Sequence, residues 1–197
     1  MPFDSNSPIV VWFRSDLRIN DHPALHAAFK TNAPVIPVYI LNQEPKMGRA
    51  SLWWLEGSLV ALKKSLEAIN SRLILRRGEP LEILHNIIKF SGAKAIYFSR
   101  CYEPASVKQE KNLASFLNKK KIECRRFSGS LLIEPEMVKS KSGNAFKVFT
   151  PFYNACLNMG IIKEPIPAPR ILVAPDEWPK SDKLESWRLR PSEPNWA

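Results

Sequence analysis

The sequence has few cysteines and lacks the short motifs that mark the commonest enzyme sites. Its three cysteines, Cys101, Cys124 and Cys156, form no C-x-x-C pair, so the sequence supports neither a disulfide framework nor a zinc site. No G-x-G-x-x-G follows the first predicted strand, and G-x-x-x-x-G-K-[ST], G-x-S-x-G and H-E-x-x-H are absent throughout. These absences disfavour an ordinary dehydrogenase, NTPase, hydrolase or metalloprotease.

Long apolar runs are also missing. No stretch approaches the roughly 18 apolar residues of a membrane span, and the first residues do not resemble a secretion signal. We therefore expect a soluble protein in a reducing, cytoplasmic setting, with no membrane partner. Charge is unbalanced, because 29 Lys and Arg oppose 19 Asp and Glu and give a net charge of +10. This surplus favours a polyanionic partner such as nucleic acid, although a solvated basic face would have the same composition.

Short β-rich runs alternate with longer amphipathic runs, a pattern typical of a parallel sheet with crossover helices. The first, second and fourth runs are mostly apolar, which places them in the middle of a sheet covered on both faces. The sequence therefore predicts an α/β fold: a Rossmann-like, doubly wound, five-stranded parallel sheet in the order 3-2-1-4-5. The predicted strands are residues 8–14, 34–40, 72–77, 94–99 and 122–127, and the predicted helices are residues 23–30, 50–70, 80–90, 106–120 and 151–159.

The helix predicted at 50–70 repeats leucine at spacings of three and four, which forms one apolar stripe against the sheet. Trp53 and Trp54 fall outside this stripe. At least one of these two large rings is therefore expected to face something other than the sheet.

After residue 160 the chain is rich in proline and shows no sustained period. We expect an α/β domain over 1–160 followed by an interdomain linker over 161–197. Three large rings in this segment are unusual for a free tail and are expected to pack on a partner surface. They are Trp178, Trp187 and Trp196.

The first predicted strand leads into W-F-R-S-D-L-R-I-N-D-H-P-A-L at residues 12–25. This segment resembles the W-F-R-x-D-L-R-x-x-D-N-P-A-L opening of the DNA photolyase and cryptochrome family, with His22 where asparagine is common. The resemblance covers essentially the whole chain and is to the amino-terminal, antenna-binding α/β domain of a deoxyribodipyrimidine photolyase. Further matching segments follow in the family's order: R-A-S-L-W-W-L at 49–55, Y-E-P at 102–104, K-V-F-T-P-F at 147–152, L-R-P at 189–191 and P-N-W-A at 194–197.

The resemblance implies a flavoprotein whose FAD lies in a carboxy-terminal helical domain that this chain lacks. Family members extrude a damaged pyrimidine pair from UV-damaged DNA and split it by electron transfer from photoexcited FAD. None of the family's FAD-binding or lesion-binding residues falls within residues 1–197, so we expect no catalytic residue here and no repair by this chain alone. Its contribution would be light capture through an antenna chromophore.

In an open parallel sheet, ligands bind beyond the carboxyl ends of the strands where the strand order reverses. The expected crevice has walls at 14–18 and 99–103 and a lid at 42–49, and photolyases hold the antenna in roughly this region. A planar chromophore needs stacking rings and a few polar anchors. The candidate residues are Asn42, Arg49, Trp53, Trp54, Arg100 and Glu103.

Each candidate has a structural alternative. The tryptophan pair could be buried at a domain interface or under the lid, and Glu103 could serve as a helix-start carboxylate. The charged residues of the first loop are interpreted as a structural ion-pair network without a catalytic role. These residues are Arg14, Asp16, Arg18 and Asp21.

The identity of the antenna is less directly indicated. One folate-binding subgroup has an Asn-Glu pair where this chain has Ala105 and Ser106, so its folate site is not carried over. The Trp53-Trp54 pair resembles a different subgroup that also uses a folate. We therefore favour methenyltetrahydrofolate over a deazaflavin or a flavin.

Three other functions remain open from the sequence. The chain could belong to a cryptochrome-type blue-light photoreceptor, which shares the fold and FAD but signals through a partner. It could be a nucleotide-binding α/β module, although it lacks a glycine-rich phosphate turn after Arg14. It could also be an interaction domain that self-associates through an exposed domain interface.

Overall fold

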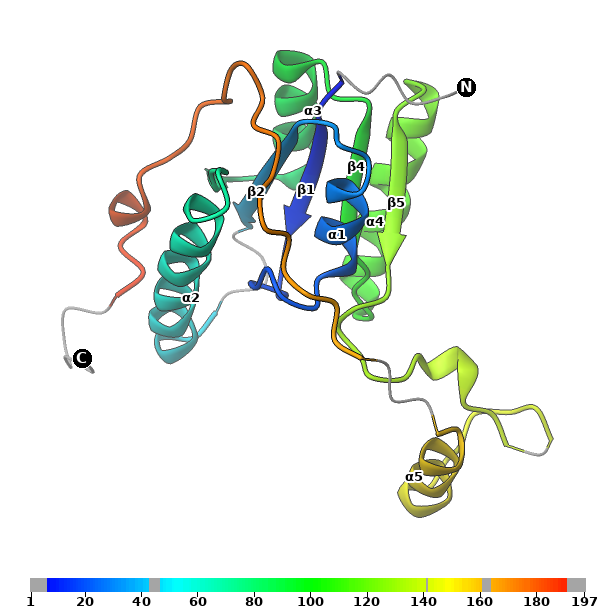
Figure 1. Cartoon of the computed structure of the whole chain (residues 1–197). Coiled ribbons are helices and arrows are strands. Elements are labelled where there is room, and N and C mark those ends of the chain that lie inside the picture. Colours follow the sequence, from blue (N-terminus) through cyan, green and yellow to red (C-terminus); the bar gives the residue numbers. More distant parts are fainter. Residues whose placement is uncertain (1–6, 43–46, 141, 161–163, 191–197) are drawn as a thin grey trace.

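The computed structural model describes residues 7–42, 47–140, 142–160 and 164–190. Its centre is a five-stranded parallel sheet with the order β3-β2-β1-β4-β5 (Figure 1). The order confirms the sequence prediction and leaves β3 and β5 at the edges. The strands are β1 (Ile9–Phe13), β2 (Val35–Leu41), β3 (Ile74–Arg77), β4 (Ala95–Ser99) and β5 (Glu123–Phe127).

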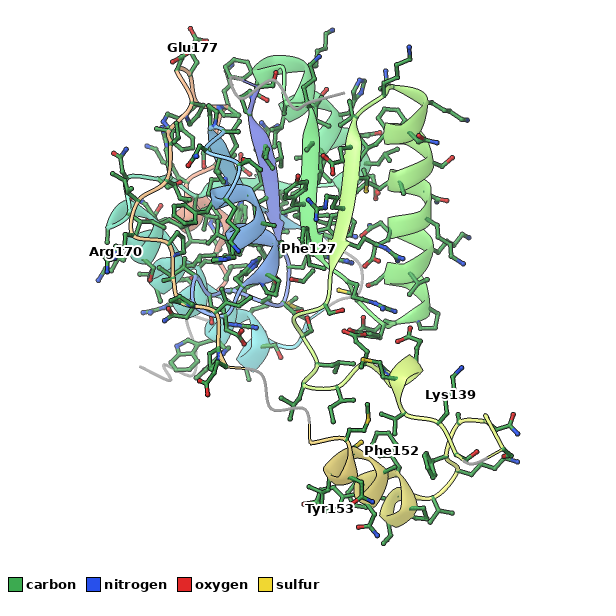
Figure 2. All side chains as sticks on the ribbon, turned by 45° about the vertical axis from the view of Figure 1, so that its right-hand side comes forward. Phe127, Lys139, Phe152, Tyr153, Arg170 and Glu177 are labelled. Atoms are coloured by element: carbon green, nitrogen blue, oxygen red, sulfur yellow. The ribbon has the colours of Figure 1, made fainter. Side chains whose placement is uncertain are left out.

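The three inner strands are apolar because both of their faces are covered. Every residue of β1, β2 and β4 is buried, whereas no residue of β5 is buried. Helices α1 (Pro23–Phe29) and α2 (Arg49–Glu67) pack on one face, and α3 (Pro80–Ser91) and α4 (Pro104–Lys119) pack on the other. Figure 2 shows α2 and α4 on opposite sides of the sheet. The fold is therefore doubly wound, as predicted.

The proline-rich segment 164–190 runs back along the α/β body. The amide of Val35 donates to the carbonyl of Val173 at 2.9 Å, and the amide of Leu172 donates to the carbonyl of Ile69 at 2.9 Å. A short 3-10 helix at Leu184–Trp187 then places the Trp187 ring 6.2 Å from that of Tyr39. The segment is thus anchored to the body by backbone hydrogen bonds and by side-chain packing.

This packing corrects one expectation from the sequence. Trp187 is 6% exposed within the α/β core, and Trp178 packs partly buried against the core on the other face of the sheet. The expectation that these two rings cover a partner surface is wrong, because the chain's own sheet and helices bury them. Trp196 lies outside the described residues.

A separate arm, which we define as residues 139, 140 and 142–160, follows β5 along the chain and extends from the body. It contains α5 (Phe149–Asn158), none of whose residues is buried. In Figure 2, Phe152 and Tyr153 lie with α5 away from the sheet, whereas Phe127 lies at the end of β5. Among the helices of the described ranges, none combines the length and apolar composition that crossing a bilayer requires.

Candidate functional site

A pocket of about 980 Å³ opens at the carboxyl end of the parallel sheet. Its lining residues come from the carboxyl-terminal parts of β1 and β2, from the segments that follow β1, β2 and β4, from the amino-terminal halves of α2 and α4, and from Pro80 at the start of α3. The pocket lies where the strand order reverses between β1 and β4, which is the usual ligand position in such sheets. Residues from the two expected walls at 14–18 and 99–103 both line it. Of the expected lid, residues 43–46 lie outside the described residues.

The two adjacent tryptophans of α2 occupy different environments. Trp54 lines the pocket and is 70% exposed, whereas Trp53 is partly buried and is not among the lining residues. Their ring centroids are 6.3 Å apart, and within the described residues the buried Nε1 of Trp53 has no hydrogen-bond partner. A planar ligand in the pocket could therefore stack on Trp54 but not on Trp53.

Two of the predicted polar anchors also line the pocket. They are Asn42, directly after β2, and Glu103, the residue that precedes α4. Glu103 occupies the N-cap position of α4, but its side chain makes no capping hydrogen bond. Tyr39 contributes an aromatic ring to the same wall, and burial raises the pKa of its hydroxyl to about 12. That hydroxyl therefore stays protonated at neutral pH and can donate a hydrogen bond.

The remaining predicted anchors do not line this pocket. Arg49 begins α2 and is exposed. Arg100 turns toward the base of the arm, where it lies 3.3 Å from a carboxylate oxygen of Glu134 and 2.6 Å from one of Glu136. The hydrogen bond to Glu136 raises the pKa of Arg100 further. A ligand role for Arg49, Arg100 or Trp53 thus stays a prediction from sequence.

A buried carboxylate stands behind the pocket wall. Glu110 of α4 is 0% exposed and accepts hydrogen bonds from Nη1 of Arg14, from Nη1 of Arg126 at 3.1 Å and from the amide of Cys101 at 2.8 Å. A buried carboxylate is stable only when it is paired and hydrogen-bonded. Glu110 thereby connects α4 to β5 and to the segments that follow β1 and β4.

A second buried pair fixes the loop after β1. The amide of Leu25 donates to Nδ1 of His22 at 3.1 Å, so the neutral ring carries its proton on Nε2, which lies 2.9 Å from Oδ2 of Asp16. Burial alone would raise the pKa of Asp16, but His22 and the amide of Arg14 outweigh it and hold this pKa well below its usual range. His22 also caps α1, a role that an asparagine can fill.

The loop residues Arg14, Arg18 and Asp21 are thus held by ion pairs and Asp16 by its contact with the His22 ring, a structural network as the sequence predicted, although Glu110, the partner of Arg14, lies outside the loop. Sequence reasoning missed Glu110. The signal for Glu110 is its position three and seven residues before Leu113 and Leu117, the other two buried residues of α4. A charged residue on that apolar stripe indicates a buried ionic contact.

The lining offers the groups that a planar ligand of modest size would need. Its volume suits a drug-sized ligand, Trp54 offers an exposed ring for stacking, and Asn42, Glu103 and Tyr39 offer hydrogen-bonding groups around it. Nothing in this lining requires a metal ion.

Comparisons with known proteins point in one direction. A family profile described as DNA photolyase matches residues 9–170. The deoxyribodipyrimidine photo-lyase of Agrobacterium fabrum is 42% identical over 192 residues, which cover 97% of this chain and 40% of that protein. Cryptochrome-1 of Arabidopsis thaliana is 35% identical over 173 residues, which cover 85% of this chain and 25% of that protein.

Solved structures agree with the sequence comparisons. The crystal structure of a class III photolyase from Agrobacterium tumefaciens matches with a TM-score of 0.91 and 42% identity, over 98% of this chain and 40% of that one. A Synechocystis cryptochrome matches with a TM-score of 0.84 and 27% identity, over 94% of this chain and 41% of that one. The chain therefore spans less than half the length of these relatives.

Proposed function

Because this chain belongs to the DNA photolyase family, we propose that it is the antenna-binding α/β domain of a light-driven deoxyribodipyrimidine photolyase. The observation that carries the proposal is the pocket at the carboxyl ends of β1, β2 and β4, with the exposed Trp54 ring on its wall. In this proposal the α/β domain comprises residues 1–160 with segment 164–190 packed on it, and a carboxy-terminal domain that holds FAD belongs to the full-length protein. UV-damaged DNA is the substrate of the full-length protein.

The antenna in this proposal is a folate, methenyltetrahydrofolate, which absorbs near-ultraviolet light and passes the excitation on to the flavin. Trp54 stacks on its ring system, and Asn42 and Glu103 bind its polar edge. The support is the shape and chemistry of the pocket: one exposed aromatic face with hydrogen-bonding groups around it. A deazaflavin or flavin is the alternative pigment.

Pigment binding is tested by titrating the chain with methenyltetrahydrofolate, FMN and a deazaflavin, with absorbance as the readout. We expect saturable folate binding with a micromolar or weaker Kd, because the tested chain spans 40% of the photolyase that it matches and the domain that would close the pocket in this proposal lies outside that match. Trp54→Ala should weaken binding at least tenfold. Trp53→Phe is the matched control, since Trp53 is the neighbouring ring outside the lining. Equal losses in both variants would argue against stacking on Trp54.

Repair of pyrimidine dimers by the chain alone is tested in a separate experiment. We expect no loss of pyrimidine dimers when the chain is illuminated with dimer-containing DNA and added FAD, because the family's flavin and lesion sites are expected outside residues 1–197. Dimer loss above that of a protein-free control would refute this division between the two domains.

A cryptochrome-type photoreceptor is the second candidate function. The observation that favours it is the 35% identity to Arabidopsis cryptochrome-1 over 85% of the chain. The α/β domain would have the same antenna role, but the full-length protein would signal to a partner. Assaying the full-length gene product for light-dependent dimer repair separates the two candidates, because only a photolyase restores the DNA.

We also propose that the isolated chain self-associates, through α5 and not through the tryptophans of segment 164–190. Phe149, Tyr153 and Leu157 are 73%, 47% and 60% exposed, and α5 contains no charged residue. An exposed apolar helix of this kind favours association with a second apolar surface. Sedimentation velocity across a concentration series tests this proposal.

A further inference from the structure

We propose that Arg14 recognises an anionic group of the ligand in the pocket and that Glu110 holds the Arg14 guanidinium in place for this role. The inference rests on the antenna function proposed above and adds the chemical class of the ligand: a planar ring system carrying a carboxylate or a phosphate. Arg14 is the specificity-determining residue, and Glu110 is a positioning residue that acts through it.

Among the described residues, three charged side chains line the pocket, and they differ in what they can offer a ligand. They are Arg14, Arg18 and Glu103. Nη2 of Arg18 already donates to the carbonyl oxygens of Asp21 at 2.9 Å and Gly129 at 2.8 Å. The Arg18 side chain is 41% exposed, so water screens its charge more than that of Arg14, whose side chain is 11% exposed. Arg14 is therefore the better placed cation.

Arg14 is held on two sides. Nη1 donates to the carboxylate of Glu110, and the guanidinium carbon lies 4.7 Å from the centroid of the Trp12 ring, which also lines the pocket. The Arg14 side chain is only 11% exposed. Within the described residues its side-chain hydrogen bond is the one to Glu110, so Nε and Nη2 keep donors for a group in the pocket. A preorganised guanidinium loses little entropy when it binds an oxyanion.

The charges around Glu110 do not balance. One buried carboxylate contacts two guanidinium groups, those of Arg14 and Arg126. Arg126 is 45% exposed and does not line the pocket, so water screens its charge. A ligand in the pocket can therefore reach the positive charge of Arg14 but not that of Arg126. Because the Arg14 side chain is little exposed to water, its attraction for an anion is stronger.

Glu103 sets the orientation of the ligand. Its carboxylate repels an anion, but it accepts hydrogen bonds from ring N–H groups such as those of a pterin or flavin. The pocket thus combines a donor at Arg14, an acceptor at Glu103 and an exposed ring at Trp54. A planar heterocycle with N–H groups at one end and an acid at the other satisfies all three.

The test compares pigments that share a ring system and differ in the number of their acidic groups; methenyltetrahydropteroate still carries one benzoate carboxylate. FMN and riboflavin share a ring system and differ by a phosphate, and methenyltetrahydrofolate and methenyltetrahydropteroate differ by the glutamate and its carboxylates. We expect wild-type protein to bind the acid-rich member of at least one pair about tenfold more tightly. The pair that shows the preference identifies the acid as phosphate or carboxylate. Raising the salt concentration should weaken the binding of that member more than the binding of the other member of the pair.

Variants then assign the preference to Arg14. Arg14→Met should reduce the ratio of the two Kd values to below about two. Glu110→Gln should give a ratio between that of Arg14→Met and that of the wild type. Arg126→Met is the matched control: it removes the other guanidinium from the same carboxylate, lies outside the lining, and should leave the ratio unchanged. Circular dichroism verifies that each variant is folded.

The possible failures are distinguishable. If wild-type protein binds both members of each pair equally, the role of Arg14 is wrong while the antenna function stands. The role of Arg14 is also wrong if Arg14→Met keeps the preference or if Arg126→Met loses it equally. If no pigment binds at all, the antenna function fails and the inference fails with it. The wild-type ratios and their salt dependence decide between these outcomes even if a variant does not fold.

Discussion

The α/β body and the arm use apolar residues in opposite ways. Every residue of β1 and β4 is buried in the body, whereas the aromatic residues of α5 in the arm are exposed, with Phe149 at 73%. The arm is fixed at its base by polar contacts, where Tyr102 and Arg100 both bind Glu134. Apolar composition alone therefore does not determine burial. The stability of the body comes from its own packing, whereas the arm contributes exposed surface and little to the stability of the body.

The largest expected difference in the free energy of unfolding is between alanine variants of two phenylalanines, one from the body and one from the arm. Phe98→Ala in β4 should lower the free energy of unfolding by about 4 kcal/mol, because Phe98 is 0% exposed and its removal leaves a cavity. Phe149→Ala in α5 should change it by less than about 0.5 kcal/mol. Urea denaturation monitored by circular dichroism measures both. A similar loss in the two variants would show that the arm is part of the cooperative core.

The second contrast uses two carboxylates that each bind arginine. Glu110→Ala should destabilise the body by about 3 kcal/mol, because it leaves the nearly buried guanidinium of Arg14 without its partner. Glu136→Ala, at the base of the arm, should leave stability close to the wild-type value, since the Glu136 side chain is 62% exposed. The same denaturation series tests this pair, and an equal response would contradict the assignment of Glu110 as a buried anchor.

A smaller effect is expected on the pH dependence of the body. Since the folded-state pKa of Asp16 lies below its unfolded value of about 3.9, the stabilisation is complete above that pH and is lost as the pH falls below it. Wild-type protein should therefore lose stability faster than Asp16→Asn between about pH 5 and pH 2. Parallel slopes for the two proteins in thermal melts would show that the Asp16 and His22 pair does not contribute.

The smallest effect on stability, with a clear effect on association, is expected for a charge placed on the arm. Phe149→Glu should leave the melting temperature unchanged and reduce self-association of the isolated chain, because two charged copies of α5 would repel each other. Sedimentation velocity of the variant and the wild type at matched concentrations measures the change. Unaltered association would exclude α5 as the contact.

Much of the body could be predicted from the sequence because local periodicity reports burial. The alternation of strands and helices predicted a parallel sheet, the apolar runs placed β1, β2 and β4 inside it, and the leucine stripe of α2 located the buried face of that helix. The position of the pocket then followed from the reversal of strand order. These features depend on spacing along the chain, which the sequence contains directly.

The features that were missed depend on long-range contacts. Trp187 is buried in the same core cluster as residues of β2 and α2, which lie more than 100 residues earlier in the chain, and nothing in its proline-rich surroundings indicates this. Within the tryptophan pair, the sequence could not decide which ring faces the pocket, because both fall outside the leucine stripe. Arg100 likewise follows β4 as expected, but the carboxylates of Glu134 and Glu136 draw it toward the arm.

The proposed function requires that the body hold a pigment at the carboxyl ends of its inner strands. A crystal structure of the chain grown with methenyltetrahydrofolate would show this directly. We expect the pterin ring to stack on Trp54 and the glutamate carboxylates to lie toward Arg14. Pigment bound at another surface, such as the exposed rings of α5, would contradict this function, and so would an empty pocket at saturating pigment.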